Sequence, residues 1–199
     1  MRVLLIGQKW LAAQVLGLCQ QRGDDVAAVI TTSAEDRLAI AARRDGIPAH
    51  ITARIEPQHV PAGLDVIVCA HAHVFVPAFA RQAPRLGALG YHPSLLPRHR
   101  GRDAIRWAIH MREVVTGGTV YWLDDGADTG PIAAQDWCWV TPGDTEQSLW
   151  RDKLAPMGLR LIGQVLAQLD QGICPRVDQP PEMATWEPAF DRPRLGGDP

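Results

Sequence analysis

The chain has 199 residues, a formal net charge of −2 at pH 7 and an isoelectric point near 6.4. This length fits one domain with a single core, and the near-neutral charge gives no basic footprint for nonspecific binding to nucleic acid or anionic membranes. The sequence has no apolar run near the roughly 20 residues that cross a bilayer, no signal-peptide pattern, and four cysteines without CxxC spacing. We therefore expect a cytoplasmic protein with reduced thiols and no nucleic-acid or membrane partner.

The first half of the chain alternates between short apolar runs and segments with helical spacing. Continuous apolar runs of this kind are typical of strands buried on both faces of a parallel sheet. The alternation predicts an α/β fold, a Rossmann-like, mostly parallel open sheet with helices on both faces. We expect strands over residues 1–6, 25–31, 66–70 and 87–91, a short strand after Pro48, and helices over 10–22, 34–44 (capped by Ser33) and 77–82.

The second half predicts an antiparallel hairpin near one edge of this sheet. Residues 119–123 and 132–140 have strand character, and their short acidic connection cannot make a parallel crossover. Helical spacing covers residues 103–110 and 145–170, where Thr145 can cap the longer helix and Pro156 and Gly158 can kink it. Residues 1–176 are expected to form the domain and residues 177–199 a tail, in which Ala184-Thr-Trp186 can add an edge strand and residues 196–199 are disordered.

His92 follows a predicted strand and opens a rigid, basic loop. Pro93 and Pro97 restrict the backbone around it, so the imidazole is held in place. Histidine is the side chain best suited to proton transfer near neutral pH, and a nearby carboxylate would fix its orientation. Asp128, in the acidic turn between the two antiparallel strands, is the candidate carboxylate. Because open α/β sheets bind ligands at the carboxyl ends of strands, we expect the two loops to meet in one cleft.

The two loops together resemble the formyltransferases that use 10-formyltetrahydrofolate. The longer motifs around His92 and Asp128 are most similar to the hydrolase-like domain of 10-formyltetrahydrofolate dehydrogenase. The resemblance implies the formyltransferase fold and a catalytic domain over residues 1–176. It covers nearly the whole chain and rests on Arg2-Val-Leu-Leu-Ile-Gly7, Tyr91-His-Pro-Ser-Leu-Leu-Pro97, Asp128-Thr-Gly-Pro-Ile132, Gln135 and Ala184-Thr-Trp186.

The resemblance assigns the chemistry to His92 and Asp128. His92 would contact the oxyanion and move protons, and Asp128 would keep it charged and oriented. Family members place an asparagine two residues before the histidine, where this chain has Gly90. Gly90 either marks a slower or differently built site or leaves room for a water molecule or a substrate group to supply the missing hydrogen bond. The folate-binding positions map to His73 and Phe75 on one wall of the pocket and to Asp124 and Asp125 on the other.

The function expected first is transfer of the formyl group from 10-formyltetrahydrofolate, the formyl donor, to an amine of a small-molecule acceptor. Hydrolysis of the same donor is the alternative, and Gly90 motivates a third hypothesis, a non-catalytic folate-binding protein. The tRNA-modifying members of the family carry a further domain and a basic surface, which we do not expect here. A homodimer is left open.

Two clusters of polar residues allow other interpretations. His71 and His73 have an i, i+2 spacing that could bind a metal ion together with His92 or Asp128, but the family chemistry needs no metal and we expect none. The basic cluster Arg98, His99, Arg100 and Arg102 can contact the glutamate tail of folate or an anionic acceptor, or form a solvated rim.

Overall fold

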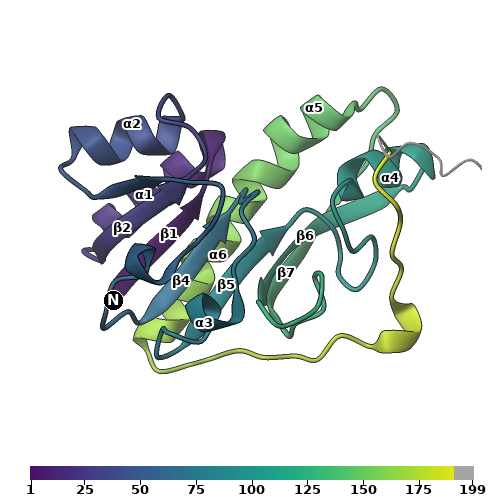
Figure 1. The fold of residues 1–199 in the computed structure, drawn as a ribbon. Helices are drawn as coiled ribbons and strands as arrows, with labels where there is room; N and C mark the ends of the chain where they lie inside the picture. The colour runs from purple at the N-terminus through teal and green to yellow at the C-terminus, as the bar shows by residue number, and fades with distance from the viewer. Residues whose placement is uncertain (191–199) are drawn as a thin grey trace, which may run out of the picture.

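Seven strands form one open sheet within residues 1–190, the part of the chain that the computed structural model describes (Figure 1). The strand order is β3-β2-β1-β4-β5-β6-β7. Neighbours from β3 to β5 are parallel, whereas β6 is antiparallel to both β5 and β7. The predicted fold class is therefore confirmed. The strands are β1 (Arg2–Gly7), β2 (Asp25–Thr31), β3 (Ala49–Ile51), β4 (Val66–Ala70), β5 (Gly87–His92), β6 (Val115–Trp122) and β7 (Ile132–Trp139).

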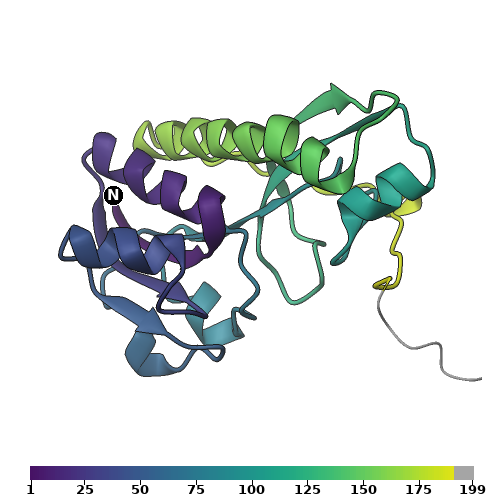
Figure 2. The same cartoon turned by 90° about the horizontal axis from the view of Figure 1, so that it is seen from above.

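Alternate residues of the central strands feed two separate cores, one on each face of the sheet. Val3 and Leu5 of β1 pack with the helices α1 (Lys9–Gln21), α2 (Arg37–Arg44) and α6 (Ala155–Asp170). Leu4 and Ile6 of the same strand pack on the other face, which is covered by α3 (Ala78–Arg81) and by loop residues such as Ile55 and Val76. Figure 2 shows α1 and α6 side by side above the sheet. The two-sided burial explains why these strands read as continuous apolar runs.

Two helices differ from the sequence-based expectation. The helix α2 begins at Arg37, because the carboxylate of Asp36, and not Ser33, accepts the hydrogen bond from the backbone N–H of Leu38. The long helix is divided into α5 (Glu146–Leu149), a π-helical turn (Trp150–Leu154) and α6. Thr145 caps α5 as predicted. The π turn ends two residues before Pro156, whose missing N–H interrupts the regular hydrogen-bond ladder.

The strand β6 begins at Val115, four residues before the predicted start, and contains the glycine pair Gly117–Gly118. An ideal Cβ on Gly117 would lie 2.1 Å from a β7 carbonyl oxygen and 2.6 Å from Leu95. One on Gly118 would lie 2.1 Å from the hydroxyl of Tyr91. Leu95 and Tyr91 thus fill the two faces of the strand at this point. Because glycine is uncommon within strands, the sequence did not predict that β6 includes Gly117 and Gly118. The packing of Leu95 and Tyr91 against the strand requires glycine at both positions.

The segment after α6 passes below the sheet and around the β7 edge toward α4 (Ala104–His110), as the yellow trace in Figure 1 shows. Val177 makes an isolated bridge with Ile132 at the start of β7. The predicted edge strand at Ala184-Thr-Trp186 is wrong, because Trp186 bridges Arg100 in the loop after β5 and does not join the sheet. Residues 196–199, expected to be disordered, lie outside the described residues. In the described chain, no helix is both long and apolar enough to span a membrane.

Candidate active site

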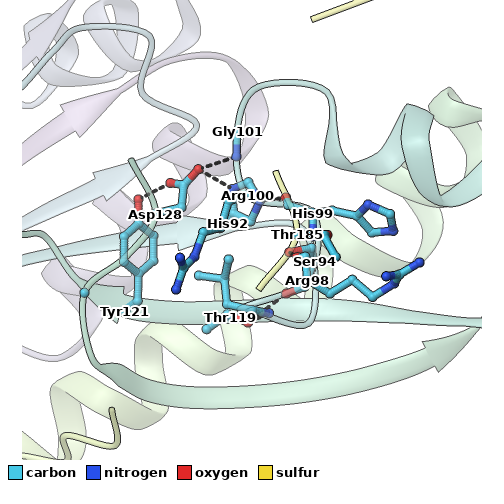
Figure 3. A network of polar contacts seen from close by, with 12 residues as sticks. His92, Ser94, Arg98, His99, Arg100, Gly101, Thr119, Tyr121, Asp128 and Thr185 are labelled. Atoms are coloured by element: carbon cyan, nitrogen blue, oxygen red, sulfur yellow. Dashed lines mark hydrogen bonds and ion pairs between the residues drawn. The ribbon is translucent and has the colours of Figure 1, made fainter. Parts of the chain in front are cut away.

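His92 is the last residue of β5, and both of its ring nitrogens face oxygen atoms (Figure 3). Nε2 lies 2.7 Å from the backbone carbonyl oxygen of His99, a hydrogen bond in which the ring must donate. Nδ1 lies 3.6 Å from Oδ2 of Asp128, which is ion-pair distance but too long for a good hydrogen bond. The residue is only 7% exposed. The carbonyl of His99 therefore fixes the tautomer, and Nδ1 is the basic atom that remains.

Asp128 is held on two sides before any substrate binds. Its Oδ1 accepts a hydrogen bond of 2.6 Å from the hydroxyl of Tyr121, and its Oδ2 accepts one of 2.8 Å from the backbone N–H of Gly101. The backbone of Asp128 is left-handed, with φ of 56°, and its carbonyl oxygen accepts from the side chain of Gln179. Aspartate tolerates this conformation better than most residues. The turn thus presents the carboxylate to His92 in one orientation, and the predicted pair is brought together.

The loop after His92 is fastened to β6 and β7 by a short chain of hydrogen bonds. The hydroxyl of Thr119 donates to the carbonyl of Ser94 at 2.7 Å. The amide of Gln135 donates to the carbonyl of Leu96 and to Thr119 at 2.9 and 2.8 Å. These groups are buried or partly buried, so the loop is set by the sheet beneath it.

The space beside Gly90 is filled by side chains. Gly90 and Tyr121 are register partners across β5 and β6. An ideal Cβ on Gly90 would lie 2.9 Å from the Tyr121 ring and 3.0 Å from Leu123. The expectation of an open space for water or substrate at Gly90 is therefore wrong. Burial, and then the neighbouring Asp128 carboxylate, raise the pKa of the Tyr121 phenol well above its ordinary value, so the phenol is a neutral donor.

Asp124 and Asp125 lie in the turn on one wall of the predicted folate site. Asp124 accepts hydrogen bonds from the N–H of Gly126 and the hydroxyl of Thr129, which shape the turn. Asp125 pairs with Arg81, the last residue of α3, so this turn contacts the element that follows residues 71–77. A pocket of about 210 Å³ opens here, lined by Arg81, Gln82, Gly87, Ala88, Trp122, Leu123, Asp124, Asp125 and Arg176.

His73 and Phe75 are the exposed residues of the segment between β4 and α3, whose Val74 and Val76 are buried, and they do not line that pocket. Nδ1 of His73 lies 3.1 Å from the amide nitrogen of Gln8, and burial followed by the charge of Lys9 lowers the pKa of His73. The Phe75 side chain is 76% exposed. The structure thus leaves this wall open to solvent.

His71 packs between two other rings, since its ring centre lies 5.2 Å from that of His73. Its ring packs edge-on against Trp150, with the ring centres 4.9 Å apart, and its buried Nδ1 has no hydrogen-bond partner among the described residues. Burial, and then the charge of Lys9, lower the pKa of His71 to about 4. Within residues 1–190, no three His, Cys, Asp or Glu side chains are grouped as metal ligands.

The sequence alone did not identify Tyr121 or the main chain of His99 as parts of the site. Strand alternation places Tyr121 on the same face as Thr119, but its contact with Asp128 depends on the turn that follows. Two arginines of the basic cluster are engaged inside the molecule: Arg98 pairs with Glu113, and Arg100 donates to Gln179.

The profile of the formyl transferase family matches residues 1–166. The chain is 35% identical to mitochondrial 10-formyltetrahydrofolate dehydrogenase of Mus musculus over 94% of its own length, but it spans only 22% of that relative. It is 32% identical to methionyl-tRNA formyltransferase of Acidobacterium capsulatum, covering 96% of this chain and 67% of the relative. The fold is similar to glycinamide ribonucleotide transformylase 1 from Symbiobacterium toebii, with a TM-score of 0.75, 25% identity, and coverage of 90% and 93% of the two chains.

Proposed function

This chain belongs to the formyl transferase family, and from that membership we propose that it transfers the formyl group of 10-formyltetrahydrofolate to an amine of a small-molecule acceptor. The observation that carries the proposal is the contact of His92 with Asp128 at the carboxyl end of β5. The two residues come from loops that are separate in sequence, and each loop carries a motif of the family. A buried, oriented histidine beside a fixed carboxylate is the arrangement that proton transfer requires.

The proposed reaction removes one proton from the amine and adds one proton to the folate nitrogen. The amine nitrogen attacks the formyl carbon, the carbonyl electron pair moves to the oxygen, and the bond from carbon to the folate nitrogen then breaks as the oxygen re-forms the carbonyl. The amine loses a proton and the folate nitrogen gains one. A single group that accepts and returns a proton balances both steps.

Nδ1 of His92 is suited to that task. Because Nε2 already donates to the carbonyl of His99, Nδ1 is the atom that can take the proton. The Asp128 carboxylate lies 3.6 Å from Nδ1, which is too far to hold a proton there in a short hydrogen bond. The proton on Nδ1 therefore stays available to the developing oxyanion or to the leaving nitrogen.

We assign donor binding to His73 and Phe75 on one wall and to Asp124 and Asp125 on the other. Phe75 is a large apolar side chain left 76% exposed, which suits a flat ring that covers it. The carboxylates of Asp124 and Asp125 and the turn backbone supply acceptors for the N–H groups of a pterin. The mixture of apolar and acceptor groups fits such a ring system.

Hydrolysis of the same donor is the second candidate. It is favoured by the 35% identity to a 10-formyltetrahydrofolate dehydrogenase, a match that covers 94% of this chain. Water would then take the place of the amine at the formyl carbon. The same proton balance at His92 would serve either nucleophile, so the distinction lies in what the acceptor side of the cleft binds.

One assay separates the candidates. Purified protein is incubated with 10-formyltetrahydrofolate, and release of tetrahydrofolate is followed with and without a panel of amines that includes amino sugars and amino-acid derivatives. We expect turnover that depends on an amine. Turnover at the same rate without any amine would replace transfer by hydrolysis. Tight binding of the donor without turnover under all conditions would leave only the folate-binding hypothesis.

A further inference from the structure

We propose that His99 is a positioning residue for His92, and that the carboxyl-terminal segment Thr185–Glu187 holds it in place. The carbonyl of His99 accepts the hydrogen bond from Nε2 of His92. The orientation of that carbonyl therefore decides which nitrogen of His92 can exchange a proton. The inference rests on the proposed function, because it gives His92 the catalytic proton.

The main chain of His99 is in an unfavourable conformation that the tail stabilises. Its φ of 55° lies in the left-handed region, where a non-glycine residue is uncommon. Its backbone N–H donates to the hydroxyl of Thr185 at 2.8 Å. The backbone of Thr185 also bonds on both sides of His99, to the carbonyl of Pro97 at 3.1 Å and from the N–H of Arg100 at 3.0 Å. One tail residue thus fixes the turn of the loop that aims the carbonyl.

The side chain of His99 lies between two acids. Nε2 is 3.0 Å from Glu113 and Nδ1 is 3.1 Å from Glu187, in ion-pair and not hydrogen-bond geometry. The His99 residue is 1% exposed, and the Glu113 and Glu187 side chains are 16% and 9% exposed. Each ring nitrogen of His99 thus faces one carboxylate, and Arg98 also pairs with Glu113.

These contacts connect the tail to the proton chemistry. Figure 3 shows the His99 ring directed away from His92 while its main chain lies against the His92 ring. Glu187 attracts the His99 ring, and Thr185 fixes the His99 backbone. If either contact is lost, the carbonyl is free to move and Nε2 of His92 loses its acceptor. Nδ1 would then no longer be the defined basic atom, although Asp128 would keep its hydrogen bond from Tyr121 and the proposed donor-binding residues lie on other elements.

The test uses variants that keep the shape of each group. Glu187→Gln removes one carboxylate, and His99→Asn removes the ring that lies between the two acids while asparagine still accepts the left-handed backbone. Thr185→Val removes the acceptor for the His99 N–H, and Thr185→Ser retains it. Glu182→Gln, an exposed acid in the same tail, is the matched control.

The expected result is a fall in kcat of about tenfold for Glu187→Gln, His99→Asn and Thr185→Val, with KM for the formyl donor within about twofold, and wild-type values for Thr185→Ser and Glu182→Gln. The pH profile of kcat should change in the first three variants only. A purely structural role would lower the melting temperature while leaving kcat per folded molecule and the pH profile as in the wild type, and that result overturns the proposal.

A second measurement does not depend on catalysis. Nitrogen-15 NMR of the imidazoles reports which ring nitrogen of His92 is protonated in the free protein. The wild type should show one tautomer with Nε2 protonated, and Thr185→Val, as the mildest variant, should show a mixture. An unchanged tautomer in a folded Thr185→Val protein would refute the inference. A wild type that shows the single tautomer but transfers no formyl group would instead refute the proposed function.

Discussion

The ring of Tyr121 occupies the space that a side chain at Gly90 would need, and its hydroxyl donates to Asp128 at 2.6 Å. The two residues are cross-strand partners in β5 and β6. The large ring at position 121 therefore fits only because position 90 has no side chain. The hydroxyl of Tyr121 on β6 reaches Asp128 because its ring lies in the space beside Gly90 of β5.

Gly90→Asn should destabilise the protein and lower turnover. The new Cβ would approach the buried ring of Tyr121 to 2.9 Å, so the ring must shift from its hydrogen bond with Asp128. Overpacking of this kind costs about 1–3 kcal/mol of unfolding free energy. Urea denaturation and kcat measure both effects. Adding Tyr121→Ala should recover part of the stability of Gly90→Asn in a double-mutant cycle, and an increase in turnover by Gly90→Asn alone would contradict the prediction.

Tyr121→Phe should lower kcat by about tenfold and leave KM for the formyl donor nearly unchanged. The variant keeps the ring that fills the space beside Gly90 but removes the hydrogen bond that orients Asp128. Steady-state kinetics checks this. The melting temperature provides the control, since the packing is retained. A fall in kcat that is matched by loss of folded protein would show that the hydroxyl serves the fold and not the carboxylate.

His92→Ala should reduce activity by about a hundredfold or more, on the order of the 10² to 10⁴ that general acid–base catalysis contributes. The residues proposed to bind folate lie on other elements, so the dissociation constant for a non-reactive donor analogue should change little. Titration calorimetry measures that binding while the assay with donor and amine measures turnover. Retained activity in the variant would remove His92 from the proposed role.

His71→Asn should make stability less sensitive to acid. Burial lowers the pKa of His71 to about 4 in the folded protein, so between pH 6.5 and about pH 4 the unfolded chain binds a proton that the folded chain does not. Stability therefore falls as pH decreases through this range. Removing the group should reduce the loss between about pH 7 and about pH 4.5 by about 1–2 kcal/mol, less than the full shift implies because the ring is partly exposed.

Asparagine suits this position because the backbone of His71 is left-handed, with φ of 54°. Denaturant unfolding at the two pH values gives the comparison. His50→Asn, on the partly buried strand β3, is the comparison, since burial and then the neighbouring His59 also lower the pKa of His50. Equal acid sensitivity of the wild type and His71→Asn would show that the ring of His71 is charged in the folded state.

The strands that the sequence predicts best are those buried on both faces. The apolar run Val66–Ala70 is found as β4 with the predicted bounds, since sandwiching between two cores leaves no room for polar residues. The start of β6 could not be predicted because Gly117 and Gly118 carry no apolar signal. Ser33 was a reasonable cap, but Asp36 lies three residues closer to the helix.

The site was predictable where its parts lie within one motif. His92 and Asp128 each follow a local signature, and the turn between the antiparallel strands β6 and β7 brings Asp128 to the end of β5. The environment of His99 depends on Glu113 and Glu187, which lie far from it and from each other in sequence, so no local pattern indicates it. The packing of Tyr121 against Gly90 depends on the register of antiparallel strands, which spacing alone does not give.

At Gly117–Gly118 strand β6 has no side chain on either face of the sheet, so residues from both sides pack directly on its backbone. Leu95 of the loop after His92 presses on one side, and Tyr91, whose hydroxyl donates to the carbonyl of Leu154 in the π turn, presses on the other. A side chain added there would displace either the loop after His92 or the π turn that carries Trp150. The loop on one face of the sheet and the helical layer on the other are thus coupled through two residues that themselves have no side chains.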